Sequence, residues 1–226
     1  MKAPEITQSP NALHRRPTRS LTMIALILSL FTSLVMAQTE AEMNPTDVLR
    51  KEHEIIRKVA DALKREAGRI QKNDTVEAER IAKFHDFFKN FADRCHHAKE
   101  EDELFPVLRE KNVDPVIIDL LVKQHAEGRI LLAGIENTLS RLTGDGSEPD
   151  TRVLARYLFE YAQLMERHIR LENEYLWPRV SERLDDSQKS DLAKAFHKIE
   201  TEELGEGFHE KYHALAMELL GKKNTP

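Results

Sequence analysis

Residues 95–106 read CHHAKEEDELFP, and within them His97 and Glu101 are four residues apart in a long segment of helical apolar periodicity. A spacing of four places both side chains on one face of a helix. The buried stripe of this helix, set by Phe84, Phe88 and Phe91, continues through Glu101, so the carboxylate points toward the core. An ionised carboxylate is costly to bury without a partner. The stretch therefore predicts a metal ion beside Glu101.

The same pattern occurs again at residues 168–178, which read HIRLENEYLWP and pair His168 with Glu172. Both copies end in two apolar residues and a proline. Each copy is also preceded by a single histidine in an amphipathic segment, His53 in the first half of the chain and His125 in the second. The chain thus contains the order His, His-x-x-x-Glu, His, His-x-x-x-Glu.

Hydrophobic periodicity predicts an all-α protein in which four helices form an up-down-up-down bundle. These helices are expected at residues 45–70, 76–106, 115–142 and 150–178, separated by polar or glycine-rich turns. Pro106 should kink or end the second helix, because proline lacks an amide hydrogen. The predicted domains are the bundle at residues 44–184 and a fifth helix packed on it at residues 187–220, with a possible break at Gly205 or Gly207.

The turns indicate whether the four histidines lie together. In antiparallel neighbours, residues at equal height are equally far from the turn that joins the helices. The midpoints of successive histidine pairs are residue 75, residue 111 and residues 146–147, each inside a predicted connection. All four histidines then share one layer, and Glu101 and Glu172 lie one turn further along their helices. We predict two metal ions, bridged by the two glutamates and each bound by two histidines.

The first 37 residues have the parts of a secretory signal peptide: basic residues up to Arg19, an uncharged run from Leu21 to Met36, and a cleavage position after Ala37. This run of 16 residues is shorter than the roughly 20 that a membrane span needs. The mature protein is therefore expected in the periplasm or secreted. If the segment is not cleaved, it would anchor the chain to the membrane.

Composition restricts the functions open to the chain. Residues 1–37 hold four of the 34 basic residues and one of the 39 acidic ones, which leaves 30 basic against 38 acidic residues. Nucleic acid is therefore not an expected partner, because its binding relies on basic patches. The single cysteine, Cys95, has no second cysteine in the chain to pair with and is predicted to be a small buried hydrophobe.

His53, the HHAKEEDELFP stretch, His125 and the His168/Glu172 pair resemble the hemerythrin-like, or HHE cation-binding, domain over residues 44–182. The resemblance implies two non-haem iron ions joined by an oxo or hydroxo group and reached by small ligands such as oxygen, nitric oxide or peroxide. The predicted metal ligands are His53, His97, Glu101, His125, His168 and Glu172. The pattern is similar to that of repair-type di-iron proteins and iron sensors. It differs from that of oxygen carriers, because Arg129 and Asn173 occupy positions where those have histidine and aspartate.

His96 and Glu100 are also four residues apart, so the first pair has a second possible register. We favour His97 and Glu101, because Leu104 and Phe105 then follow at the offsets of the apolar pair that follows the family's His-x-x-x-Glu motif. A ligand set of imidazoles and carboxylates without thiolate indicates iron or manganese rather than structural zinc.

Two functions fit this predicted site. The first is a di-iron protein of the cell envelope that binds oxygen, nitric oxide or peroxide and, if it is an enzyme, reduces them. The second is a protein that stores, senses or donates iron without turnover. In the fifth helix, Glu206, His209 and His213 share a face. They could form another metal site, hydrogen-bond to the first site, or belong to an ordinary packed helix.

Overall fold

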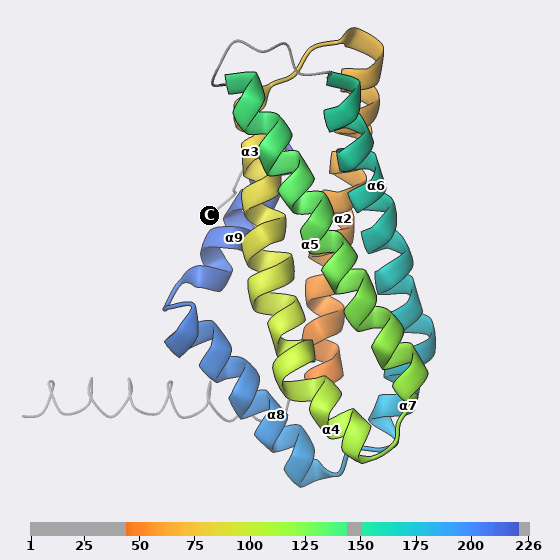
Figure 1. The fold of residues 1–226 in the computed structure, drawn as a ribbon. Coiled ribbons are helices and arrows are strands. Elements are labelled where there is room, and N and C mark those ends of the chain that lie inside the picture. Colours follow the sequence, from red (N-terminus) through yellow and green to blue (C-terminus); the bar gives the residue numbers. More distant parts are fainter. Residues whose placement is uncertain (1–43, 144–150, 222–226) are drawn as a thin grey trace, which may run out of the picture. The chain divides into compact units, whose positions relative to one another are not determined.

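The computed structural model describes residues 44–143 and 151–221, and within them every regular element is helical (Figure 1). The prediction of an all-α helical bundle is confirmed. The first helix of the bundle is α2 (Pro45–Asn73), and the second consists of four consecutive segments: α3 (Ala78–Phe87), η1 (Phe88–His97), η2 (Lys99–Leu104) and α4 (Phe105–Glu110). The third helix is α5 (Pro115–Thr143), and the fourth consists of α6 (Thr151–Leu171), η3 (Glu172–Leu176) and α7 (Trp177–Ser181). The C-terminal segment contains α8 (Asp186–Lys198), η4 (Ile199–Glu203) and α9 (Phe208–Leu219).

Local sequence signals explain where the helices begin and end. The Asn44 side chain accepts a hydrogen bond from the Thr46 amide at 3.2 Å, which caps α2, and Pro45 occupies its first turn. The helix ends where Asp74 adopts a left-handed conformation, at φ 51°. Asp185 forms a capping box with Gln188 at the start of α8. The turn predicted between residues 70 and 76 is confirmed, although α2 continues to Asn73, whereas the connection predicted around residues 146–147 lies outside the described residues.

The bundle core consists of two apolar clusters with a polar layer between them. The first cluster contains Ile56, Ala92, Leu131 and Met165, and the second contains other residues of the same helices, among them Leu49, Leu104, Leu121 and Leu176. In each of the four helices of the bundle, the predicted histidine lies between a residue of the first cluster and a residue of the second cluster along the sequence. Apolar packing therefore holds the polar layer in place from both ends.

Three segments near the polar layer are π-helical: η1, η2 and η3. A π-helix bonds each amide to the carbonyl five residues back, so its turns contain more residues than those of an α-helix. Pro106 follows η2 in the first turn of α4, and Pro178 follows η3 in the first turn of α7. The second helix therefore does not end at Pro106, because proline is tolerated in a first helical turn.

The C-terminal segment is two helices rather than one. Gly205 and Gly207 have positive φ values of 96° and 77°, and they separate η4 from α9. The predicted break is thus confirmed. Helix α8 packs against α2 and η2, and α9 packs against α3 and α2. Figure 1 shows α8 and α9 beside the second helix of the bundle, which contains α3 and α4.

The described residues include no helix with the length and apolar character needed to cross a membrane. The predicted signal peptide, residues 1–37, lies outside the described part of the chain.

Candidate metal centre

Two overlapping clusters of potential metal ligands occupy the polar layer. We name them by one member each: the His53 cluster is His53, His96, Glu100 and Glu172, and the His125 cluster is His97, Glu100, His125 and His168. Within each cluster, one ligand atom from every residue lies within 4.8 Å of the others. All seven residues are buried, with exposed fractions of at most 3%. Because Glu100 belongs to both clusters, the two form a single centre.

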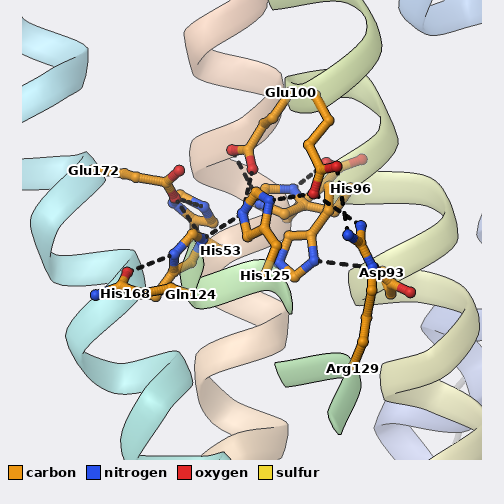
Figure 2. A network of polar contacts seen from close by, with 12 residues as sticks. His53, Asp93, His96, Glu100, Gln124, His125, Arg129, His168 and Glu172 are labelled. Atoms are coloured by element: carbon orange, nitrogen blue, oxygen red, sulfur yellow. Dashed lines mark hydrogen bonds and ion pairs between the residues drawn. The ribbon is translucent and has the colours of Figure 1, made fainter. Parts of the chain in front are cut away.

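The two glutamates approach the histidines from η2 and η3 (Figure 2). Glu100 lies 3.4 Å from Nε2 of His96 and 3.4 Å from Nε2 of His125, through different oxygens. Oε2 of Glu172 lies 3.0 Å from Nε2 of His53 and 3.2 Å from Nε2 of His168. Each carboxylate therefore faces one imidazole from each cluster.

Every imidazole of the centre is held in place through its Nδ1 atom, which contacts a side-chain oxygen. The contacts are His53 with Asn173 at 3.0 Å, His96 with Glu52 at 2.8 Å, His97 with Asp93 at 3.4 Å, His125 with Glu101 at 2.6 Å and His168 with Gln124 at 3.1 Å. Metal-binding histidines characteristically donate their second ring nitrogen in this way, which fixes the tautomer and the ring orientation. Five Nε2 atoms are thereby left for the centre.

Several atoms of the centre have no hydrogen-bond partner. Both carboxylate oxygens of Glu100 and of Glu172, and Nε2 of His53 and His96, are buried without one. The ion-pair distances above bring these atoms close together without the geometry of a hydrogen bond. Buried polar atoms normally find partners, so a group of six unsatisfied atoms calls for an explanation. A cation coordinated by these nitrogens and oxygens satisfies all of them, and the residues present therefore fit a metal.

The charges of the centre shift its ionisation. Burial alone would lower the pKa of His125, but the neighbouring carboxylates of Glu100 and Glu101 outweigh burial and raise it to about 9. Burial also opposes ionisation of Glu172, yet His168 and His53 hold the pKa of this carboxyl well below its usual value. His97 has a pKa well below its usual value, because it is buried beside other imidazoles. The centre thus holds at least one proton that a metal would displace.

The structure places five of the six predicted ligands in the centre: His53, His97, His125, His168 and Glu172. Glu101 lies outside both clusters, where it accepts from Nδ1 of His125 and from Arg129. Glu100 takes the predicted position of Glu101, and His96, the histidine of the second possible register, is a further member. The reason is that η1 and η2 are π-helical, so positions inferred from α-helical periodicity are rotated by about one residue.

A signal in the sequence could have identified His96 and Glu100. His53 and His125, His96 and His168, and Glu100 and Glu172 are each separated by 72 positions, whereas His97 and His168 are 71 apart. The supporting residues repeat at the same spacing, since Glu52 corresponds to Gln124 and Glu101 to Asn173. Of the seven residues of the centre, only His97 lacks a matching residue at this spacing, because its counterpart is Ile169.

Arg129 connects two of the supporting carboxylates at the protein surface. Its guanidinium donates to Asp93 at 2.8 Å and to Glu101 at 2.8 Å, and these two carboxylates contact His97 and His125. A surface cavity of about 410 Å³ has Asp93, Glu101 and Arg129 in its lining. The His125 cluster is therefore separated from this cavity by a single layer of polar side chains.

His209 of α9 contacts Oε1 of Glu52 at 3.2 Å, so one of the three polar residues noted in the C-terminal segment reaches the residue that supports His96. Glu206 and His213 are in none of the potential metal-ligand groups of the described residues. Cys95 is buried and free, as predicted, and burial raises the pKa of its thiol to about 12.

Comparison with known proteins identifies the class. The model of the hemerythrin HHE cation-binding domain matches residues 44–180 and, in a second placement, residues 116–208. The chain belongs to this family. The two placements begin 72 residues apart, which is the spacing of the internal repeat. The buried centre is accordingly a cation-binding site of the hemerythrin type.

The chain is also similar to the uncharacterized proteins Rv1995 of Mycobacterium tuberculosis and Mb2018 of Mycobacterium bovis. Each is 24% identical over 164 residues, which cover 72% of this chain and 63% of the relative. The chain thus spans less than two thirds of the length of these relatives. No solved structure matches it significantly.

Proposed function

We propose that the protein is a non-haem di-iron protein that binds oxygen, nitric oxide or peroxide. The observation that carries this proposal is the arrangement of five imidazoles, each held at Nδ1, around two buried carboxylates whose four oxygens have no hydrogen-bond partner. One ion would be held by His53 and His96, and the other by His97, His125 and His168. Glu100 and Glu172 would bridge them.

The ligand set supports iron over zinc. Structural zinc usually has four ligands and often thiolates, whereas this centre offers seven side chains and no sulfur. Bound iron would supply redox chemistry and coordination positions that the protein does not fill. The two clusters share the histidines unequally, so the side of His53 and His96 has one imidazole fewer. An ion on this side would have one more coordination position that the protein does not fill.

The chain's own residues would orient the ligands and exclude water. Because all seven residues of the centre are at most 3% exposed, only a small molecule could reach it without opening the bundle. The supporting oxygens contact Nδ1 of each imidazole and so direct each Nε2 inward, where it could bind a metal after losing any proton it carries. A location in the cell envelope remains part of the proposal and rests on residues 1–37 alone.

Metal analysis combined with optical spectroscopy tests this function. The purified protein should contain two irons per chain and, when its reduced form is exposed to air, develop near-ultraviolet absorption from an oxo-bridged pair. Adding nitric oxide to the reduced protein should change the spectrum. A chain that retains iron but shows no response to air, nitric oxide or peroxide would contradict the ligand-binding function.

A second candidate is an iron-storing, iron-sensing or iron-donating protein. It is favoured by the surface cavity beside Asp93 and Glu101, which lies one polar layer away from the His125 cluster. Loss of iron to an added chelator distinguishes the two candidates. Release within minutes, without loss of the fold, would favour iron exchange, whereas release only on unfolding would favour a permanent cofactor.

A further inference from the structure

One half of the internal repeat contains a buried charged group that the other half lacks. Glu52 and Lys99 belong to the first half, and the residues 72 positions later are Gln124 and Leu171. Glu52 and Gln124 perform the same local task, because each contacts Nδ1 of a histidine of the centre. The second half thus shows that neither the carboxylate nor the ammonium is required to hold such a histidine.

The charged group joins the bundle to the C-terminal segment. Lys99 Nζ donates to Glu52 and to Glu200 of η4, and it lies 5.9 Å from the centre of the Phe196 ring of α8. The Lys99 side chain is fully buried and Glu52 is 2% exposed. His209 of α9 approaches the same Glu52 oxygen as Lys99 does. Glu52 therefore has one oxygen toward the C-terminal segment and the other toward His96.

Hydrophobic packing alone does not account for this arrangement. Taking an ammonium and a carboxylate out of water is costly, and apolar residues of similar size commonly stabilise a core as well or better. The second half of the repeat has such an apolar residue in Leu171. The buried charges are better explained by the position they impose on Glu52 than by a gain in stability.

We propose that Lys99 and Glu200 are positioning residues through which the C-terminal segment fixes Glu52, and with it the imidazole of His96. The continuous path is Glu200, Lys99, Glu52, His96. It reaches the His53 cluster, because His96 is not a member of the His125 cluster. The C-terminal segment thereby acts on one side of the centre. This inference rests on the proposed metal site, and its test includes a measurement without metal.

The first measurement is a titration of the metal-free protein with cobalt(II) alone as the probe. Glu200→Gln keeps the size of the side chain and removes its charge. It should lower the affinity for one of two cobalt ions about tenfold, the lower end of the effect of altering residues that support metal ligands. Glu218→Gln is the matched control. Glu218 joins the C-terminal segment to the bundle through Lys83, as Glu200 does through Lys99, but it has no contact with the path. It should leave both affinities unchanged.

A double-mutant cycle tests the path itself. Glu52→Gln combined with Lys99→Leu gives the first half the residues that the second half already has, and it avoids leaving a single buried charge. In this background, Glu200→Gln should change cobalt affinity by less than about twofold, because the residues through which it acts are gone and residues of one ion-pair network have non-additive effects. An equal loss of affinity in both backgrounds, or no loss in the original chain, would overturn the proposal.

The measurement without metal is the nitrogen NMR spectrum of labelled histidines. The Nδ1–H signal of His96 should shift in Glu200→Gln and keep its position in Glu218→Gln. If the His96 signal shifts in neither variant, the positioning role is refuted, even if the cobalt affinity changes. Failure of the original chain to bind cobalt, with the His96 shift still present, would refute the proposed metal site and leave the positioning path supported.

Discussion

The adjacent residues Glu100 and Glu101 offer the sharpest test of the centre. Both carry a carboxylate in the same segment, but Glu100 is fully buried with both oxygens unsatisfied, whereas Glu101 is 23% exposed and contacts His125 and Arg129. We compare Glu100→Gln with Glu101→Gln. Each change preserves the size of the side chain and removes one charge, so the two variants differ only in the position they alter.

The expected magnitudes differ. A structural metal site is worth about 10–16 kcal/mol, which divided among four ligands is about 2.5–4 kcal/mol for each. Loss of one ligand should therefore weaken binding roughly 70- to 1,000-fold. Glu100→Gln should do this for both ions, because Glu100 belongs to both clusters. Glu101→Gln removes only a support of His125 and should weaken one ion by about 10- to 100-fold.

The assay is iron content after dialysis against a chelator, followed by calorimetric titration of each variant. Circular dichroism should show the same helix content in both variants, which separates ligand loss from misfolding. If Glu101→Gln loses both ions and Glu100→Gln keeps them, the register read from the structure is wrong.

Three further predictions concern pH, packing and the thiol. A metal needs the unprotonated imidazole of His125, so metal affinity should rise about tenfold per pH unit from pH 6.5 and level off above the His125 pKa of about 9. A constant metal affinity in titrations over this pH range would contradict the proton linkage. Phe84→Ala should lower the free energy of unfolding by about 3–5 kcal/mol in denaturant titrations, because the Phe84 side chain is fully buried. Phe159 is 40% exposed, so Phe159→Ala should lower the free energy of unfolding by less than about 1 kcal/mol. Equal losses in the two variants would refute the assigned core. Cys95, whose pKa burial raises to about 12, should resist alkylation at neutral pH until the chain unfolds, and mass spectrometry of the treated native protein would reveal any reaction that contradicts this.

The fold could be predicted from the sequence because its signals are local and redundant. Asn44 and Pro45 mark the start of α2, and Asp185 with Gln188 marks the start of α8. Apolar periodicity defines the buried faces, and short connections impose antiparallel neighbours. The equal distance of the histidines from the turns was sufficient to predict one shared layer. None of these inferences depends on the detailed winding of a helix.

The identity of the first carboxylate does depend on that winding. α-Helical geometry assigned His97 and Glu101 to the same inward face, but the π-helical turns of η1 and η2 direct His96 and Glu100 inward and keep His97 inside as well. Local residue preferences do not specify where a π-helical turn forms. The 72-residue repeat does contain the register seen in the structure, because it compares the two halves of the chain without assuming a helix geometry.

The supporting contacts were beyond sequence reasoning for a different reason. Glu52 and His209 are 157 positions apart, and Lys99 meets Glu200 across 101 positions. Their encounter depends on how the C-terminal segment packs on the bundle. Amphipathic periodicity shows that such a segment packs on something, but it does not give the partner.

The most direct test of the central claim is the metal content of the purified protein, measured together with its optical spectrum in the reduced state and after exposure to air. The account predicts two irons per chain and new near-ultraviolet absorption on oxidation. A chain without iron, or with one zinc ion and no spectral change, would contradict it.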